Sequence, residues 1–286
     1  MIYLSRFFFP DAGQETACLS SERRTCYNTF YPFQILPAKQ LTRLDFEPIT
    51  ILYGGNGSGK TTVLNIIAET LQLNRDTLYN RSNFFEAYTE LCDFAVQKRI
   101  PTHSSVITSD DIFDYMLNLR SINNGIHERR EDLFREYLDD KYADFQMQSL
   151  DDYEQLKRIN LSRRKSQSQY VRRRLMDNIR THSNGESAFA YFSEKINDNG
   201  LYLLDEPENS LSPARQQQLA DFLISSARFF GCQFIIATHS PFLLSMENAK
   251  IYDLDESPVC TKPWTTLENV RAYYDFFRKH AAEFAQ

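Results

Sequence analysis

The chain has 286 residues, of which 42% are hydrophobic and 14% aromatic, and it carries a net charge of −6. This content supports a sizeable folded core, so the chain is either one large domain or a compact domain with an insertion. The acidic average gives no indication of nucleic-acid binding, although an average can hide a local excess of positive charge.

The cysteines and the apolar runs indicate a reduced, cytoplasmic protein. The five cysteines form no C-x-x-C pair, so neither a disulfide framework nor a zinc site is predicted. The N-terminal stretch MIYLSRFFFP is too short and too broken for a signal peptide. No uninterrupted apolar run approaches the roughly 20 residues that span a membrane. We therefore expect a cytoplasmic location without membrane insertion.

The chain begins with strand patterns. Residues 2–9 alternate loosely and are rich in β-forming residues, which predicts a strand. Residues 10–30 are polar and give no clear signal. Two further strands are predicted at 31–35 and 41–46, followed by an apolar, β-branched run at 48–53 of the kind found in central parallel strands. This order predicts a small antiparallel sheet that leads into a parallel one.

A glycine-rich loop follows that run, within residues 51–62, ILYGGNGSGKTT. It matches the phosphate-loop pattern G-x-x-x-x-G-K-[ST], in which glycines allow a tight turn that points backbone N–H groups at phosphates. The helix pattern that comes next has a broad apolar face, and its N-terminus adds positive potential. A chance glycine-rich turn is the alternative, but the flanking patterns favour a nucleoside-triphosphate site. The predicted phosphate-binding residues are Gly54, Gly55, Asn56, Gly57, Ser58, Gly59, Lys60, Thr61 and Thr62.

The pattern becomes helical in residues 74–180, which hold one glycine and one proline. Asp110 and Asp111 precede apolar residues at helical spacing, as an N-cap precedes an amphipathic helix. We interpret residues 74–180 as a helical insertion, or lobe, in a core domain formed by residues 1–73 and 181–286.

The insertion ends in a basic segment at 157–180, with nine lysines and arginines against one acid, Asp177. One interpretation is a solvated helix face that pairs with acids elsewhere in the insertion. The other is a surface that contacts the phosphates of a nucleic acid. Tyr170 is the one aromatic residue of the segment, which argues against base stacking. The pattern leaves both interpretations open.

Strands and helices alternate after the insertion. Residues 200–207 predict a buried strand that ends in two acids, and Ser212-Pro213 starts a helix that ends at Gly231. Further strands are predicted at 233–237 and 249–254, and a C-terminal helix at 267–277. This alternation predicts an α/β fold with a parallel sheet, whose ligand lies at the carboxyl ends of the strands.

Three residues at those strand ends are candidates for metal binding and catalysis. Asp205 would hold Mg²⁺, directly or through water, together with the Thr61 hydroxyl, while Lys60 reaches the terminal phosphates. Glu206 would orient and deprotonate the attacking water. His239 follows the next strand and could donate a hydrogen bond to the γ-phosphate, although a lone histidine is more often structural.

A second turn, SNGES at residues 183–187, opens another predicted helix. A Ser-x-Gly-Glu turn at a helix N-terminus can bind an anion. Ordinary helix capping by Ser183 is the alternative, and the spacing alone favours it.

Together these motifs resemble those of ATP-binding-cassette (ABC) ATPases, and in particular the SMC-like group of AAA-family ATPases. Residues 54–61 resemble the Walker A motif, 201–206 Walker B, 183–186 the ABC signature, 208–212 the D-loop, and His239 the switch histidine. The resemblance implies a P-loop NTPase fold with an ABC-type mixed sheet core that uses ATP and Mg²⁺. It also implies that two copies sandwich two nucleotides, so that Ser183 and Gly185 of one copy contact the ATP of the other.

The chain departs from the family pattern at three places. No glutamine stands in a Q-loop context, and Asn83, within residues 82–85, is the nearest substitute. The insertion is short and lacks the C-x-x-C zinc hook of long-armed repair ATPases. No aromatic residue can be assigned to adenine stacking.

We expect an ATP hydrolase that works as an ATP-gated homodimeric clamp or switch on DNA, RNA or a protein effector, in genome maintenance or phage defence. The alternative is the ATPase subunit of an ABC membrane transporter, for which the long charged insertion is atypical. A nucleotide switch with negligible turnover is a third hypothesis, but Glu206 argues against it because a pure switch needs no base.

Overall fold

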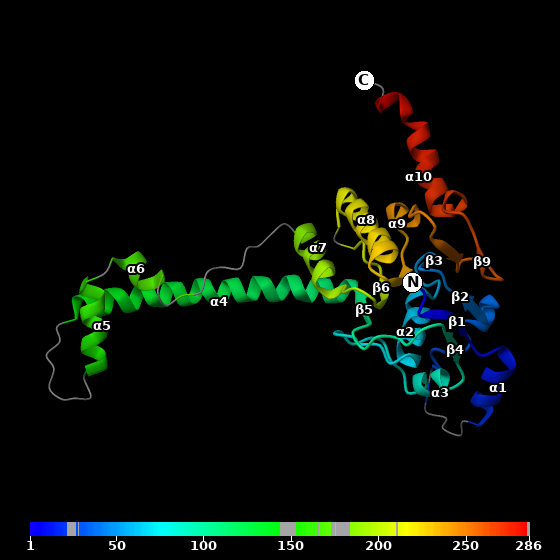
Figure 1. Cartoon of the computed structure of the whole chain (residues 1–286), viewed down its shortest axis with the longest axis horizontal. Coiled ribbons are helices and arrows are strands. Elements are labelled where there is room, and N and C mark those ends of the chain that lie inside the picture. Colours follow the sequence, from blue (N-terminus) through cyan, green and yellow to red (C-terminus); the bar gives the residue numbers. More distant parts are fainter. Residues whose placement is uncertain are drawn as a thin grey trace. The chain divides into compact units, whose positions relative to one another are not determined.

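The computed structural model describes residues 1–21, 27, 29–143, 153–164, 166–172, 175, 184–209 and 211–284. The chain divides into a core unit, Met1–Phe113 with Asn184–Gln286, and an insertion unit, Asp114–Ser183; Figure 1 shows the elements of both. Among the described helices, none is long and apolar enough to cross a membrane.

The core unit is built on a six-stranded sheet. In spatial order its strands are β5 (Ser105–Thr108), β6 (Leu201–Asp205), β7 (Gln233–Ala237), β3 (Ile49–Tyr53), β8 (Lys250–Asp253) and β9 (Cys260–Thr261). All neighbouring strands are parallel except β8 and β9, which are antiparallel. Every residue of β3 and β7 is buried, as expected of parallel strands covered on both faces. The predicted α/β fold with a mixed, mostly parallel sheet is confirmed.

A three-stranded antiparallel sheet joins the parallel one, in the order β2 (Arg43–Asp45), β1 (Leu4–Phe8) and β4 (Asp93–Val96). Gln233, the fully buried first residue of β7, connects the two sheets. Its Oε1 accepts the backbone N–H groups of Tyr3 (2.8 Å) and Leu4 (2.9 Å), and its Nε2 donates to the Leu4 carbonyl (2.8 Å). The predicted small antiparallel sheet is confirmed for β1 and β2, which precede the parallel strands, whereas its third strand, β4, follows the glycine-rich loop in the chain.

The strand predicted at residues 31–35 is wrong, since this stretch forms turns and bends. Pro32 has no backbone N–H to offer a strand ladder, and Gln34 has a φ of 69°, a left-handed conformation that no strand contains. The Gln34 N–H instead donates to Glu15 Oε2 at 2.6 Å. Glu15 lies on helix α1 (Ala12–Ser21), in a stretch for which no element was predicted. The short helix η1 (Pro37–Lys39) follows.

Two helices pack against the central strands. Helix α2 (Lys60–Thr70) contributes Val63, Leu64, Ile66 and Ile67 to a buried cluster that also contains residues of β6 and β7. Helix α8 (Pro213–Phe229) buries Leu219, Leu223 and Ala227 and packs against β7. The other described helices of this unit are α3 (Phe85–Thr89), α7 (Asn184–Lys195), α9 (Pro241–Leu244), η3 (Trp264–Thr266), α10 (Glu268–Lys279) and η4 (Ala281–Phe284). The predicted helices that begin after Ser212 and near residue 267 are confirmed.

The insertion unit begins at Asp114 rather than at residue 74, where the sequence pattern placed its start. Residues 74–113 belong to the core unit because two short strands within them, β4 and β5, pair with β1 and β6. The insertion helices are α4 (Ser109–Tyr142), which starts in the core unit, α5 (Tyr153–Arg164) and α6 (Gln167–Arg172). A small cluster of buried residues holds them together: Leu133, Tyr137, Tyr170 and Val171.

The predicted helical character of the insertion is confirmed where the structure describes it. Part of the predicted basic segment lies outside the described residues, namely Lys165, Arg173, Arg174 and Arg180. The choice between a solvated face and a nucleic-acid surface therefore stays a prediction.

Candidate functional site

The glycine-rich loop runs from the end of β3 into α2, as the sequence predicted. Gly57 and Gly59 have φ values of 79° and 96°, in the left-handed region that glycine enters without steric cost. Glycine is required at position 54 for another reason, because a Cβ atom there would lie 2.5 Å from Ser58 Oγ. The loop encloses a cavity of about 220 Å³ lined by residues 56–62, Ile35 and Glu206.

Lys60 lies at the mouth of this loop with only 5% of its surface exposed. Its ammonium donates to the carbonyls of Gly54 (2.7 Å) and Gly55 (3.0 Å), and it lies 4.0 Å from Glu206 Oε1. Ser58 Oγ is buried nearby without a hydrogen-bond partner. A buried ammonium and an orphaned hydroxyl in a glycine-rich turn at the start of a helix form a donor set that suits phosphate oxygens.

Asp205 ends β6, the strand next to β7, and accepts a hydrogen bond from the Thr61 hydroxyl at 3.1 Å. Burial raises the pKa of Asp205 to about 6, with a further upward contribution from the charge of Glu206; the Thr61 hydrogen bond and the charge of Lys60 act in the opposite direction. A buried carboxylate beside a hydroxyl is an all-oxygen donor pair of the kind that Mg²⁺ prefers. The structure thus brings Thr61 and Asp205, the two predicted metal ligands, together.

Asparagine at position 205 should stabilise the nucleotide-free protein at neutral pH. In the folded protein the pKa of Asp205 is about 6, above the ordinary value of 3.8. Protonation of Asp205 therefore stabilises the folded state, fully so below pH 3.8, and this stabilisation is lost as the pH rises through 6. The difference between the two pKa values corresponds to at most about 3 kcal/mol in the free energy of unfolding. The gain in melting temperature of Asp205→Asn over wild type should be largest above pH 7 and shrink toward pH 4. A gain that is equal at pH 4 and pH 8 would contradict the assigned pKa.

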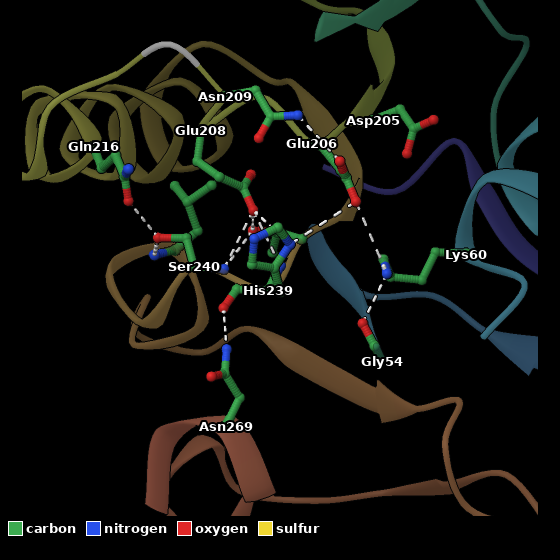
Figure 2. A network of polar contacts seen from close by, with 12 residues as sticks. Gly54, Lys60, Asp205, Glu206, Glu208, Asn209, Gln216, His239, Ser240 and Asn269 are labelled. Atoms are coloured by element: carbon green, nitrogen blue, oxygen red, sulfur yellow. Dashed lines mark hydrogen bonds and ion pairs between the residues drawn. The ribbon is translucent and has the colours of Figure 1, made fainter. Parts of the chain in front are cut away.

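Glu206 follows Asp205 with a φ of 47°, a left-handed conformation that is costly for a residue with a side chain. Its N–H donates to the Ala237 carbonyl at 2.9 Å, and Asn209 Nδ2 donates to its Oε2 at 3.0 Å. These contacts hold the carboxylate over the loop, between Lys60 and His239, as Figure 2 shows. Strain at a carboxylate that is held from two sides is typical of a functional residue.

His239 lies just beyond β7, and 44% of its side chain is exposed. Its Nδ1 is 3.8 Å from Glu206 Oε1 and 3.6 Å from Glu208 Oε1. The structure therefore brings the two predicted catalytic residues, Glu206 and His239, to the same edge as Lys60. We name residues 238–240, which contain His239, the switch turn.

Glu208 is a site residue whose role the sequence analysis did not foresee. It is 5% exposed, and its Oε1 accepts the Thr238 hydroxyl (2.5 Å) and the backbone N–H groups of His239 (3.0 Å) and Ser240 (3.2 Å). It thereby fixes the backbone of the switch turn. The signal that could have found it is a second acid, two residues after Glu206, in a turn between a buried strand and a helix.

Asp255 is a second residue that was missed. Its Oδ2 accepts the backbone N–H of Gly55 at 2.8 Å, and its own N–H donates to Asp253 Oδ1 at 3.0 Å. Asp255 lies just beyond β8, which pairs with β3 on the side opposite β7. From there it supports the start of the phosphate loop. Nothing in its local sequence indicates this contact, because the two residues are 200 positions apart.

Strand β5, which pairs with β6, ends in Thr108. In the register of this pair Thr108 is the partner of Asp205. Thr108 also caps α4 reciprocally: its Oγ1 accepts the Asp111 N–H (3.3 Å), while Asp111 Oδ2 accepts the Thr108 N–H (2.6 Å). Asn83, the expected Q-loop substitute, instead donates to the Tyr27 hydroxyl at 3.4 Å. Thr108 is therefore the neighbour of Asp205 in the sheet, and the role of Asn83 as a Q-loop substitute stays a prediction.

The predicted signature turn is described only in part. Ser183 lies outside the described residues, and Gly185 lies in the first turn of α7. The helix predicted to follow this turn is confirmed, with Ala188 and Phe192 buried on its inner face. Contact of Ser183 and Gly185 with a nucleotide stays a prediction.

A larger cavity, of about 900 Å³, lies beside the switch turn and α10. Its lining is mostly apolar and aromatic, including Phe242, Trp264, Tyr273 and Phe277. The smaller cavity over the loop is therefore the better candidate for a phosphate site, because its donors match that ligand.

A glycine-rich loop between a parallel strand and a helix, with its lysine near two acids at the end of another strand of the same sheet, defines a P-loop NTPase. A family model described as "AAA domain, putative AbiEii toxin, Type IV TA system" matches residues 49–200, more than half of the chain. The chain belongs to this AAA-domain family, and the predicted AAA-family membership is confirmed. A second model, "AAA ATPase domain", matches residues 172–244, which contain Glu206 and His239.

Solved structures that are similar to this chain include two heads of SMC proteins. The Smc head domain of Pyrococcus furiosus, with an extended coiled coil and bound to the C-terminal domain of ScpA, is 13% identical, with a TM-score of 0.39. That match covers 82% of this chain and 95% of the other. The SMC head domain of Thermotoga maritima is 11% identical, with a TM-score of 0.37, and the match covers 92% of this chain and 99% of the other. No curated protein matches the chain.

Proposed function

We propose that this protein binds ATP with Mg²⁺ and hydrolyses it at the glycine-rich loop. The observation that carries the proposal is the position of Glu206, whose Oε1 lies 4.0 Å from Lys60 Nζ and 3.8 Å from His239 Nδ1. Membership in the AAA-domain family supports the same activity. A carboxylate held above a phosphate-binding lysine is suited to activate water against the terminal phosphate.

Each residue of the site has a distinct part in this reaction. The loop N–H groups and Lys60 bind the β- and γ-phosphates, and Lys60 exchanges its present carbonyl partners for phosphate oxygens. Thr61 and Asp205 would hold Mg²⁺, which neutralises charge on the phosphates when it is bound. Glu206 accepts a proton from water as the water oxygen bonds to the γ-phosphorus and the bond to the ADP oxygen breaks. His239 donates a hydrogen bond to the γ-phosphate.

The proposal extends to an ATP-gated homodimer that acts on nucleic acid or on a protein effector. In this arrangement Ser183 and Gly185 of each copy contact the nucleotide bound by the other, as the resemblance to ABC ATPases implies. ATP would then join two copies, and hydrolysis would release them.

Light scattering of Glu206→Gln, with and without Mg-ATP, tests this extension. We expect a monomer without nucleotide and a dimer with it, because slow turnover preserves the ATP that joins the two copies. Lys60→Ala is the matched control and should stay monomeric in both conditions. A mass that ATP does not change would contradict the homodimer. Adding duplex DNA to the dimer then distinguishes a nucleic-acid target, which gives a heavier species, from a protein effector.

A further inference from the structure

Thr238, the first residue beyond β7, still pairs with β3, since its N–H donates to the Leu52 carbonyl at 3.2 Å. The next residue, His239, is held at its backbone in a different way. Two side chains hold that backbone from different elements. Glu208 Oε1 accepts its N–H at 3.0 Å, and Asn269 Nδ2 donates to its carbonyl at 2.9 Å. Figure 2 shows Asn269 on the C-terminal helix α10, at the side of His239 away from Glu208.

Asn269 also touches the strand that carries the phosphate loop. Its backbone N–H lies in the first turn of α10, where helical N–H groups have no partner within the helix, and it donates to the Tyr53 hydroxyl at 3.1 Å. Tyr53 is the last residue of β3 and directly precedes Gly54. One residue of α10 thus connects the start of the phosphate loop with the switch turn.

The other two residues of the switch turn have anchors of their own. Thr238 and Ser240 are buried, and Ser240 Oγ donates to Gln216 Oε1 at 2.6 Å. On the α10 side the 900 Å³ cavity borders His239 and Ser240. The start of α10 is fixed by Leu267 and Val270, which are buried, whereas its later aromatic residues are about half exposed. His239 itself has 44% of its side chain exposed, so the hydrogen bonds to its backbone contribute to its restraint.

We infer that Asn269 is a positioning residue, which holds His239 at its distance from Glu206. Through Asn269, the relative position of these two proposed catalytic residues depends on the position of the first turn of α10. The role in hydrolysis rests on the proposed function. The positioning of His239 does not, since it concerns the protein without nucleotide. Asn269 contacts neither Glu206 nor the loop cavity in the described structure, so its effect passes through the backbone of His239.

Asn269→Asp is the sharpest test, since it preserves size but replaces the N–H donor with an oxygen that faces the His239 carbonyl. Asn269→Ala is the second variant, and Asn248→Asp is the matched control, because Asn248 is exposed and gains the same charge in the same unit. Hydrogen exchange of the peptide 238–245 in the nucleotide-free protein should become roughly five- to tenfold faster in both Asn269 variants, as expected for the loss of one hydrogen bond. The loop peptide 54–62 and Asn248→Asp should exchange as in wild type.

Steady-state kinetics give the second readout. The kcat for ATP should fall roughly five- to tenfold in the Asn269 variants with KM unchanged, because His239 is misplaced while the phosphate loop stays intact. Unchanged exchange at 238–245 would overturn the inference, as would acceleration spread evenly over the whole sheet, which indicates general destabilisation. A wild type that does not hydrolyse ATP would refute the proposed function, while the exchange comparison would still decide the role of Asn269.

Discussion

Replacing Glu206 with glutamine should lower kcat for ATP hydrolysis by about 10² to 10⁴-fold, the range that a general base contributes. Glutamine preserves the shape of the side chain and can still accept from Asn209, which donates to Glu206 Oε2 at 3.0 Å. It cannot take a proton from water at neutral pH. The affinity for ATP should stay within a few-fold of wild type, because Glu206 makes no bond to the loop backbone that binds phosphate.

The kinetics and the binding should be measured on the same preparations, with phosphate release under single-turnover conditions and with a fluorescent ATP analogue. Glu247→Gln is a suitable control, since Glu247 is exposed and makes the same change of charge in the same unit. Hydrolysis by Glu206→Gln at the wild-type rate would show that another group activates the water.

Replacing Lys60 with alanine should weaken ATP binding by at least about 100-fold, since charge-assisted hydrogen bonds to phosphate contribute about 1.5–3 kcal/mol each. In the nucleotide-free state the ammonium bonds the carbonyls of Gly54 and Gly55, so the variant also loses two contacts that shape the loop. The loss of the phosphate contact and the loss of the loop contacts both weaken the binding of ATP itself. The change at Glu206 is instead expected to slow hydrolysis.

Titration calorimetry with Mg-ATP measures this loss directly, and a melting curve verifies that the variant is folded. Lys98→Ala serves as the control for removing an exposed lysine of the core unit. Wild-type affinity in Lys60→Ala would mean that ATP binds elsewhere, and the large apolar cavity beside α10 would then be the first place to look.

The parts of the site that the sequence could predict are those whose chemistry is local. The phosphate loop is a contiguous run, and Asp205, Glu206 and His239 follow buried strands with clear apolar patterns. Parallel strands meet ligands at their carboxyl ends, so these three residues could be expected at one edge before their neighbours were known.

The residues that were missed depend on the order of strands in the sheet. Glu208 reaches the switch turn because β6 and β7 are neighbours, and Asp255 reaches Gly55 because β8 lies beside β3. Thr108 lies next to Asp205 because β5 forms the edge of the sheet. Spacing along the chain does not specify which strands pair, so the partners of these three residues could not be predicted, although the acidic turn after β6 marked Glu208 itself.

The misplaced start of the insertion has a similar cause. Strands β4 and β5 have four residues each, and β4 is largely exposed. Neither shows the alternating or continuous apolar pattern that identifies a strand. Their place in the core unit is determined by pairing with β1 and β6, which lie far from them in the sequence.

The link from Gln233 to the first strand has a consequence for how the protein is made. The partner of Tyr3 and Leu4 follows them in the chain by 230 and 229 positions. Asp255 is made 200 positions after Gly55, which at the usual pace of translation is roughly 10–40 s. During that time the nascent chain holds a glycine-rich loop without its support from Asp255, and the sheet of β1, β2 and β4 without its link to Gln233. The supported form of the phosphate loop is therefore a property that the chain acquires only after Asp255 has been made.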